Sequence, residues 1–365
     1  MDNQAVENRK VYFDYMRFFA TIAVILLHVS GDGYNTTAIN SLHWHVLEVS
    51  NSLVRWGVSV FVMISGALFL SRDIPLKKIY SKYILHLATA FFAWSIFYAI
   101  IGEGTLSERV LAVFSGHFHM WFIPMIIGLY MCIPFIKPIA NDQKISRYYI
   151  ILSFMLVFII PEINSLIGDF GAYPLTFIPR IFRALTGNLS IKIVLGFPVF
   201  FVLGHHLNTV ILDKKQRRII YILGIIGFIS TIMLCIVVTM KTGKACTTYL
   251  ETFTVNVFLE ALAVFVWFKY KKWDNKKLNN IMIKLSKYSF GAYLIHPLII
   301  RLIKKIIIVL QATLVRPAIC DSKIGLNTFV FNPIISIVFI TITVTVMSYV
   351  ISIILNHIPF IRRTV

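Results

Sequence analysis

Four residues of the first apolar stretch bear side chains that can do chemistry, and they share one helical face: Asp14, Arg17, Thr21 and His28. An α-helix turns about 100° and rises 1.5 Å per residue, so Arg17 and His28 differ by about 20° around the axis and by about 16 Å along it. Asp14 is predicted to pair with Arg17 three residues later. Taken alone, Arg17 could be a residue whose long side chain extends to the inner membrane surface, and His28 could be a residue of the outer membrane interface. Their common face favours a functional site, because ionisable residues within a bilayer face a bundle interior or a wet cavity.

The composition requires the helix that carries these residues to lie in a membrane. The chain has 365 residues, of which 58% are hydrophobic and 14% charged, with a net charge of +19. Globular domains are about 45–50% apolar and about 25% charged. The aromatic and aliphatic content excludes disorder, and a nucleic-acid binder would be less apolar, so no nucleic-acid partner is expected. We predict an all-α, polytopic transmembrane bundle that forms one domain over residues 1–365.

Helices that cross a bilayer need about 20 mostly apolar residues. Ten stretches qualify, and none resembles a cleavable signal peptide. They lie near 11–30, 50–70, 79–101, 118–139, 147–163, 190–207, 217–240, 249–270, 281–302 and 332–356.

The basic residues predict the orientation, because Lys and Arg favour cytoplasmic loops. Ten spans with both termini cytoplasmic place 23 of the 35 basic residues and 7 of the 16 acids inside. An odd number of spans would bring basic loops to both sides. Most of this charge is expected to set the topology and to meet anionic membrane lipids.

Four motifs occur in order on the expected spans. They are Asp14-x-x-Arg17 with His28, Phe61-Val62-Met63-Ile64-Ser65-Gly66, His119-Met120-Trp121-Phe122-Ile123-Pro124, and Ser289-Phe290-Gly291-Ala292-Tyr293-Leu294-Ile295-His296. Together, over about residues 11 to 356, they resemble the acyltransferase-3 family of integral membrane acyltransferases, in its stand-alone form closest to surface-polysaccharide O-acetyltransferases.

The resemblance implies an activity and its partners. It implies transfer of an acyl group, usually acetyl, from cytoplasmic acyl-CoA to a hydroxyl of a surface glycan or a lipid-linked sugar. Acetyl-CoA would be the donor substrate, and the protein would lie in a bacterial inner membrane. The family histidine that matches His28 is taken to be catalytic and the arginine that matches Arg17 essential, with Asp14 in the same motif.

Transfer from a thioester to an alcohol needs a base or a nucleophilic relay, and histidine can serve as either near neutral pH. It also needs donors for the developing oxyanion. Ser65 is a candidate hydrogen-bond donor to this oxyanion and a candidate contact of the bound acyl-CoA, although Ser65-Gly66 also fits a helix-packing contact.

The phosphates of CoA would be bound by basic residues on the cytoplasmic side. Arg72, Lys77, Lys78 and Lys82 follow the second span. The family often has arginines at these positions. Lysine cannot form the bidentate hydrogen bonds that arginine makes to a phosphate. A basic loop that only sets topology is the alternative, since residues 269–277 are equally basic.

Candidates for binding the acceptor lie in the outer halves of the spans. His119 and Trp121 can contact a sugar, although aromatic residues also form interfacial belts. Glu48 and Arg55 are seven residues apart, so they share a face and can pair with each other. Tyr293 and His296 belong to the late motif, and Pro297 gives His296 an alternative structural role as the partner of a freed carbonyl.

One acid and two cysteines have more than one possible role. Glu260 lies in mid-span, where a functional carboxylate and a structural partner for Arg or His are equally expected. Cys246 and Cys320 both fall in predicted outer loops and can form a bridge only in an oxidising compartment. No metal-ligand spacing is present, and we expect no metal.

The chief rival function is a transporter or flippase for glycans or small anions. Transporters often contain internal repeats, but the Asp14–His28 pattern of the first half has no counterpart in the second. A membrane sensor without turnover is a third possibility.

Overall fold

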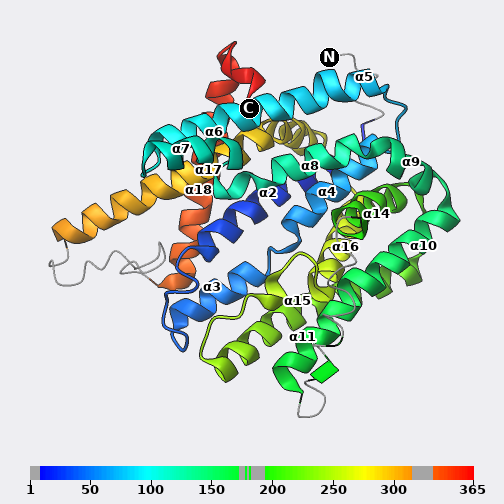
Figure 1. Ribbon diagram of the computed structural model, residues 1–365, viewed down its shortest axis with the longest axis horizontal. Helices are drawn as coiled ribbons and strands as arrows, with labels where there is room; N and C mark the ends of the chain where they lie inside the picture. Colours follow the sequence, from blue (N-terminus) through cyan, green and yellow to red (C-terminus); the bar gives the residue numbers. More distant parts are fainter. Residues whose placement is uncertain (1–8, 172–176, 179–180, 182–193, 315–331) are drawn as a thin grey trace.

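The structure is a computed structural model that describes residues 9–171, 177–178, 181, 194–314 and 332–365. Within those ranges all regular structure is helical and no strand occurs, which confirms the all-α bundle (Figure 1).

The helices of the first half follow one another with short connections. They are α2 (Tyr12–Gly31), α3 (Leu42–Ser52), α4 (Trp56–Phe69), α5 (Leu76–Lys78), the π-helix η1 (Ile79–Ile84), α6 (Leu85–Ile101), α7 (Leu106–Ser115), the 3-10 helix η2 (Phe118–Trp121), α8 (Phe122–Met131), α9 (Ile133–Asn141), α10 (Gln143–Ser153), the π-helix η3 (Phe154–Ile159) and α11 (Ile160–Phe170).

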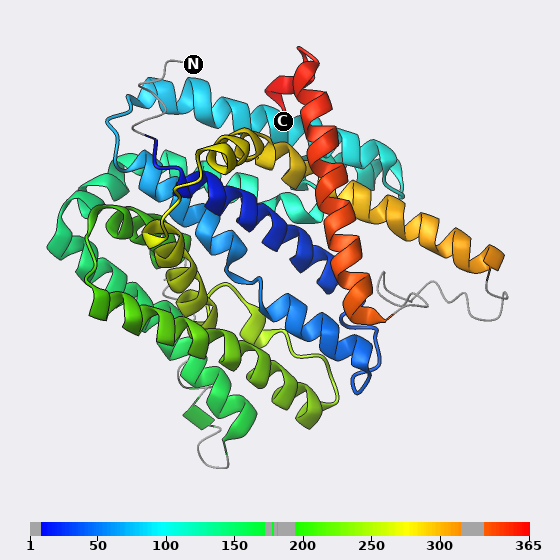
Figure 2. The ribbon, with the colours of Figure 1, turned by 180° about the vertical axis from the view of Figure 1, so that it is seen from behind.

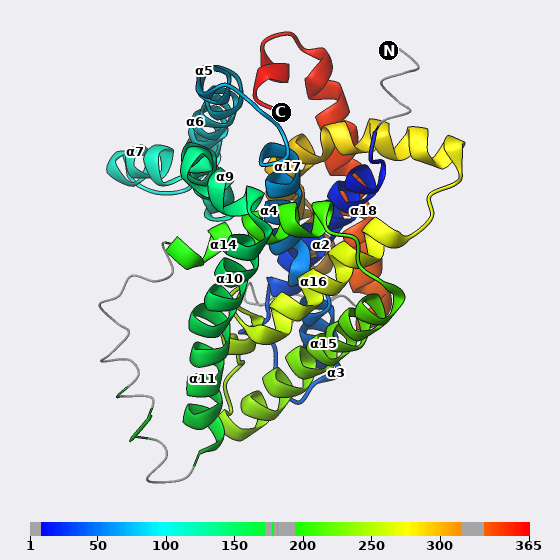
Figure 3. The same ribbon diagram turned by 90° about the vertical axis from the view of Figure 1, so that its right-hand side faces the viewer.

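The second half contains fewer and longer helices. They are α14 (Phe197–Thr209), α15 (Lys214–Thr242), the 3-10 helix η5 (Thr248–Leu250), α16 (Val255–Tyr270), α17 (Lys276–Leu314), α18 (Pro333–His357) and the 3-10 helix η7 (Ile361–Arg363). Figure 3 shows α10 and α11 as one continuous column on one flank, with α6 and α7 apart from it.

Eight helical segments of the described residues are long and apolar enough to cross a membrane. They match eight of the ten predicted spans. The predicted span at 281–302 lies within α17, which has 39 residues. The predicted span at 190–207 begins outside the described residues, and its described part is the 13-residue α14, which is short for a crossing. The orientation of the bundle stays a prediction.

Polar side chains cap the N-termini of several helices. Thr105 and Glu108 form a reciprocal capping box at α7, as Asp213 and Gln216 do at α15. The carboxylate of Asp142 accepts from two backbone N–H groups at the start of α10. Such caps satisfy N–H groups that have no partner within the helix.

The first helix lies at the centre of the bundle, with α4, α16, α17 and α18 packed against it. Figure 2 shows α18 running beside α2 on the face opposite to that of Figure 1. Because α2 is surrounded by helices rather than by lipid, the polar face that carries Arg17 and His28 is turned toward protein and cavities.

The second predicted span is broken into two helices. The segment Leu42–Phe69 counts as one membrane-spanning unit, but residues 53–55 form a turn between α3 and α4. Arg55 is the residue that precedes α4. Interrupted helices within a membrane are tolerated where they lie against protein or a cavity, and this break brings a cation into the bundle.

Two glycines allow α4 and α14 to pack backbone against backbone. A Cβ atom on Gly66 would lie 1.9 Å from the carbonyl oxygen of Phe201, and one on Gly204 would lie 1.9 Å from that of Met63. The packing interpretation of Ser65-Gly66 therefore holds for Gly66, because small residues allow close helix contacts in membranes.

We predict that Gly66→Ala lowers the free energy of unfolding by about 2 kcal/mol or more, because the new methyl group overlaps rigid backbone atoms. Gly128→Ala is the matched control, since a Cβ there has no neighbour within 4 Å. Unfolding of the purified protein in detergent measures both. An equal effect of the two substitutions would contradict the close contact.

Candidate active site

Three cavities lie in series along α2. The inner cavity, named for its side in the predicted topology, has a volume of about 540 Å³, the central cavity about 510 Å³ and the outer cavity about 580 Å³. Arg17 lines both the inner and the central cavity. His28 lines both the central and the outer cavity. The predicted polar face of the first span thus follows a path through the bundle, with one ionisable residue of this helix at each junction.

Asp14 does not pair with Arg17, so the predicted pairing is wrong. Its carboxylate accepts from Arg9, with Nε 2.8 Å from Oδ2 and Nη2 2.5 Å from Oδ1. The hydroxyl of Ser286 on α17 donates to the same carboxylate at 2.5 Å. The chain ahead of α2 folds back and brings Arg9 to this acid, a contact that helical spacing does not reveal.

Arg17 is therefore left without an acid. Among the described residues, no carboxylate oxygen lies within 4.0 Å of its guanidinium. A guanidinium inside a bilayer is costly without a partner, and this one lies where the inner and central cavities meet. The arrangement is suited to an anion or a polar group that enters from the inner cavity.

His28 is held by its own helix and by α17. Its Nδ1 lies 2.9 Å from the carbonyl oxygen of Val24 and 3.0 Å from Nε2 of His296. Nδ1 of His296 lies 2.5 Å from the carbonyl oxygen of Tyr293. Carbonyl oxygens only accept, so both Nδ1 atoms carry hydrogen. In the neutral ring, Nε2 of His296 then accepts from Nδ1–H of His28.

This assignment leaves Nε2 of His28 as the basic nitrogen. It makes no hydrogen bond to any described residue, and the ring lines the central and outer cavities. His296 is completely buried and lines neither of these cavities. The late motif thus supplies a group that orients the imidazole of the first motif, as a second residue does in hydrolytic triads.

The other predicted acceptor-side aromatics gather beside this pair. His119, Trp121 and Tyr293 all line the central cavity. The hydroxyl of Tyr293 donates to the backbone carbonyl of His119 at 2.5 Å, which joins α17 to the segment before α8. Trp121 is 45% exposed, so its ring is available to a ligand.

Ser65 also lines the central cavity, but at the end opposite to His28. Helix α4 runs antiparallel to α2, so Ser65 lies at the level of Arg17 and Arg55 lies near that of His28. Ser65 and Arg55 are ten residues apart on this span, or about 15 Å. Ser65 therefore lies away from the imidazole of His28, a position that does not fit the predicted role of stabilising an oxyanion beside it.

The predicted phosphate ligands separate into two groups. Arg72 lines the inner cavity together with Arg9 and Lys10. Lys77, Lys78 and Lys82 are exposed and line none of the cavities described above. The loop that carries Arg72 is tied to α9, because Lys137 donates to the carboxylate of Asp73 and to the carbonyl of Arg72. This contact also lowers the pKa of the Asp73 carboxyl below its ordinary value.

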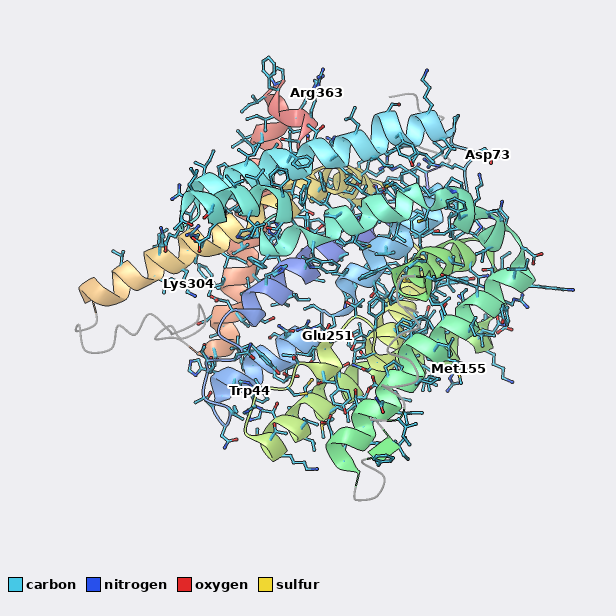
Figure 4. All side chains as sticks on the ribbon, in the orientation of Figure 1. Trp44, Asp73, Met155, Glu251, Lys304 and Arg363 are labelled. Carbon is cyan, nitrogen blue, oxygen red and sulfur yellow. The ribbon has the colours of Figure 1, made fainter. Side chains whose placement is uncertain are left out.

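Figure 4 shows Asp73, which lies in this loop, at the end of the molecule away from Lys304 on the outer part of α17. The basic loop and the outer cavity thus lie at opposite ends of the path.

Asn208 lines the inner cavity as well, and its side-chain oxygen accepts hydrogen bonds from Tyr12 and Lys10. The sequence does not identify Asn208 as a site residue, because a single amide near the end of a helix has no characteristic spacing from other polar residues.

Glu48 is fully buried and does not line the three cavities. It accepts from Tyr34 and from Ser52 at 2.7 Å, so the pairing of Glu48 with Arg55 does not occur. Arg55 donates to Asn51 instead. Glu48 acts as a structural acceptor at the outer end of the bundle.

Glu260 is also completely buried and accepts from Thr231 at 2.5 Å. This contact ties α15 to α16, but the partner is a threonine rather than the predicted Arg or His, and Oε2 has no hydrogen-bond partner among the described residues. Cys246 is a free, buried cysteine, and its proposed partner Cys320 lies outside the described residues. Over the described part of the chain no cluster of His, Cys, Asp or Glu could hold a metal ion.

The eight apolar helices define a multi-pass integral membrane protein. The family profile described as an acyltransferase domain matches residues 10–353. The chain therefore belongs to the acyltransferase-3 family of membrane acyltransferases. No curated protein and no solved structure matches the chain.

The pairing of Asp14 can be measured by double-mutant cycles. We predict a coupling free energy of about 1 kcal/mol or more between Asp14→Asn and Arg9→Gln, since the two groups share two charge-assisted hydrogen bonds. The cycle of Asp14→Asn with Arg17→Gln is the matched comparison and should give a smaller coupling. Unfolding in detergent supplies the free energies. A larger coupling with Arg17 would contradict the observed pairing.

Proposed function

We propose that the protein transfers an acyl group, acetyl in the simplest case, from cytoplasmic acyl-CoA to a hydroxyl of a glycan or lipid-linked sugar on the opposite side of the bacterial inner membrane. The observation that carries the proposal is the path of three cavities, with Arg17 at the inner junction and His28 at the outer one.

The donor would enter from the inner cavity. Its phosphates would meet Arg72, Arg9 and Lys10, since basic side chains bind phosphate oxygens. The pantetheine arm would pass Arg17 and Ser65 in the central cavity. Arg17 and His28 are about 16 Å apart along α2, so an extended arm brings the thioester to the imidazole. Lys77, Lys78 and Lys82 would contribute only to the electrostatic field of this surface.

The reaction follows from the state of His28. The acceptor hydroxyl loses its proton to Nε2 as its oxygen attacks the thioester carbonyl carbon, which forms the new ester C–O bond. The tetrahedral intermediate then expels the thiolate of CoA as the C–S bond breaks, and the proton on Nε2 passes to that sulfur. His296 accepts the hydrogen bond of Nδ1–H throughout, which keeps the ring oriented and stabilises its transient positive charge.

A transporter remains the alternative class, and turnover separates the two. We predict that His28→Ala lowers the release of free CoA thiol from acetyl-CoA by about 100-fold or more in purified protein supplied with an acceptor mixture extracted from the cell envelope, because the base is removed. His357→Ala is the matched control, since His357 is exposed near the end of α18. Release that is unchanged in His28→Ala, or absent from the unmodified protein, would contradict acyl transfer.

His296 is a positioning residue, and its role has a distinct kinetic signature. We predict that His296→Ala lowers kcat by about 100-fold with little change in the KM for acetyl-CoA, because the donor site is remote and only the orientation of His28 is lost.

The conservative variant tests this role against simple loss of packing. His296→Gln offers an amide oxygen to the same N–H and should recover part of kcat. Equal losses in the alanine and glutamine variants, with intact thermal stability in both, would show that the hydrogen bond has no part in the reaction.

A further inference from the structure

Arg55 is a second arginine with no acid at salt-bridge distance, and Glu251 and Glu48 act on its charge only from farther away. It lines both the central and the outer cavity, as His28 does. It donates to Oδ1 of Asn51, and its Nε is buried with no hydrogen-bond acceptor in the described part of the protein. No described carboxylate oxygen lies within 4.0 Å of it.

Asn51 is itself fixed, which determines how Arg55 points. Its amide nitrogen donates to the hydroxyl of Ser30 at 3.0 Å and lies 3.3 Å from the carbonyl of Leu27. The amide oxygen is therefore turned toward Arg55. The guanidinium is held at the outer junction by a neutral acceptor, and its acidic neighbours Glu251 and Glu48 make no hydrogen bond to it.

Two more cations line the outer cavity, Arg301 and Lys304. Lys304 is balanced by Asp32, with Nζ 3.1 Å from Oδ1. Arg301 lies 3.7 Å from Glu103, a fully exposed carboxylate that does not line the cavity. On the central-cavity side of Arg55, Glu251 is the acid that lines the wall. Among the described residues, the lining of the outer cavity therefore has three cations, Arg55, Arg301 and Lys304, against one acid, Asp32, and Arg55 is its innermost cation.

Burying a guanidinium without a counter-ion is unfavourable, and a ligand that brings a negative charge would remove this cost. The position limits which ligand that is. The basic inner cavity lies beyond Arg17, about 16 Å from the level of His28, and is suited to the phosphates of the donor. Arg55 lies on the other side of the reaction centre, where the acceptor must enter.

We propose that the acyl acceptor is an anionic glycan, and that the outer cavity binds its carboxylate or phosphate through Arg55. The inference rests on the acyl transfer proposed above, because it assigns the outer cavity to the acceptor. A sugar held by its negative group at Arg55 presents a neighbouring hydroxyl to His28, and a neutral sugar lacks this anchor.

Equilibrium binding tests the proposal without turnover. The full-length protein in phosphatidylcholine nanodiscs, with no acetyl-CoA, is titrated with matched pairs of probes: methyl glucuronide against methyl glucoside, and glycerol 1-phosphate against glycerol. We expect at least one anionic member to bind about 10-fold or more tightly than its neutral partner, since a charge-assisted hydrogen bond contributes about 1.5–3 kcal/mol. Arg55→Gln should remove this preference.

Lys305→Gln is the matched control. It removes a positive charge from the residue next to Lys304, but Lys305 is exposed and does not line the outer cavity. Its preference for the anionic probes should equal that of the unmodified protein, whereas Lys304→Gln should reduce it by a few-fold.

Three results would overturn the proposal. They are equal or absent binding of the anionic and neutral members of both pairs, a preference that survives Arg55→Gln, and loss of anionic-probe binding when the nanodiscs contain phosphatidylglycerol. The last would assign the cavity to lipid headgroups. Because no acetyl-CoA is present, each result is separate from the failure of acyl transfer, which the thiol-release assay detects.

Discussion

Polar side chains inside a bilayer must either find partners in the protein or face a wet cavity, and both solutions occur along α2. The carboxylate of Asp14 is satisfied by Arg9 and Ser286, and the Nδ1 of His28 is satisfied by Val24 and His296. The groups left over are the guanidinium of Arg17 and the Nε2 of His28, and both belong to residues that line cavities. These are two of the groups that the proposed reaction uses.

The surrounding helices make this pattern possible. Gly66 and Gly204 let α4 and α14 approach until their backbones touch, which holds α4 rigidly on the side away from α2. The turn between α3 and α4 then brings Arg55 into the bundle beside the outer cavity. In the proposed reaction, the donor and the acceptor would reach His28 from opposite ends of this path.

Much of the fold follows from the sequence because the bilayer limits the choices. A stretch of about 20 apolar residues in a membrane must be helical, so eight of the ten predicted spans appear as apolar helices of sufficient length. The other two predicted spans do not appear as separate apolar helices of this length, and the structure shows why. The described part of the span at 190–207 is the short α14, and the span at 281–302 lies within α17, where Lys284 and Lys287 interrupt the apolar sequence.

The sequence predicted the residues of the candidate site better than it predicted their partners. Helical periodicity by itself placed Arg17 and His28 on one face, because that relation is local and set by the 3.6-residue turn. It could not assign partners: Asp14 pairs with Arg9 rather than Arg17, and Glu48 with Tyr34 rather than Arg55. Nor could it place His296 against His28, 268 residues away. The sequence determined that this is a helical membrane protein with a polar face on its first span, whereas the tertiary structure decided which polar groups are neutralised and which remain free, because that depends on contacts between helices distant in the chain.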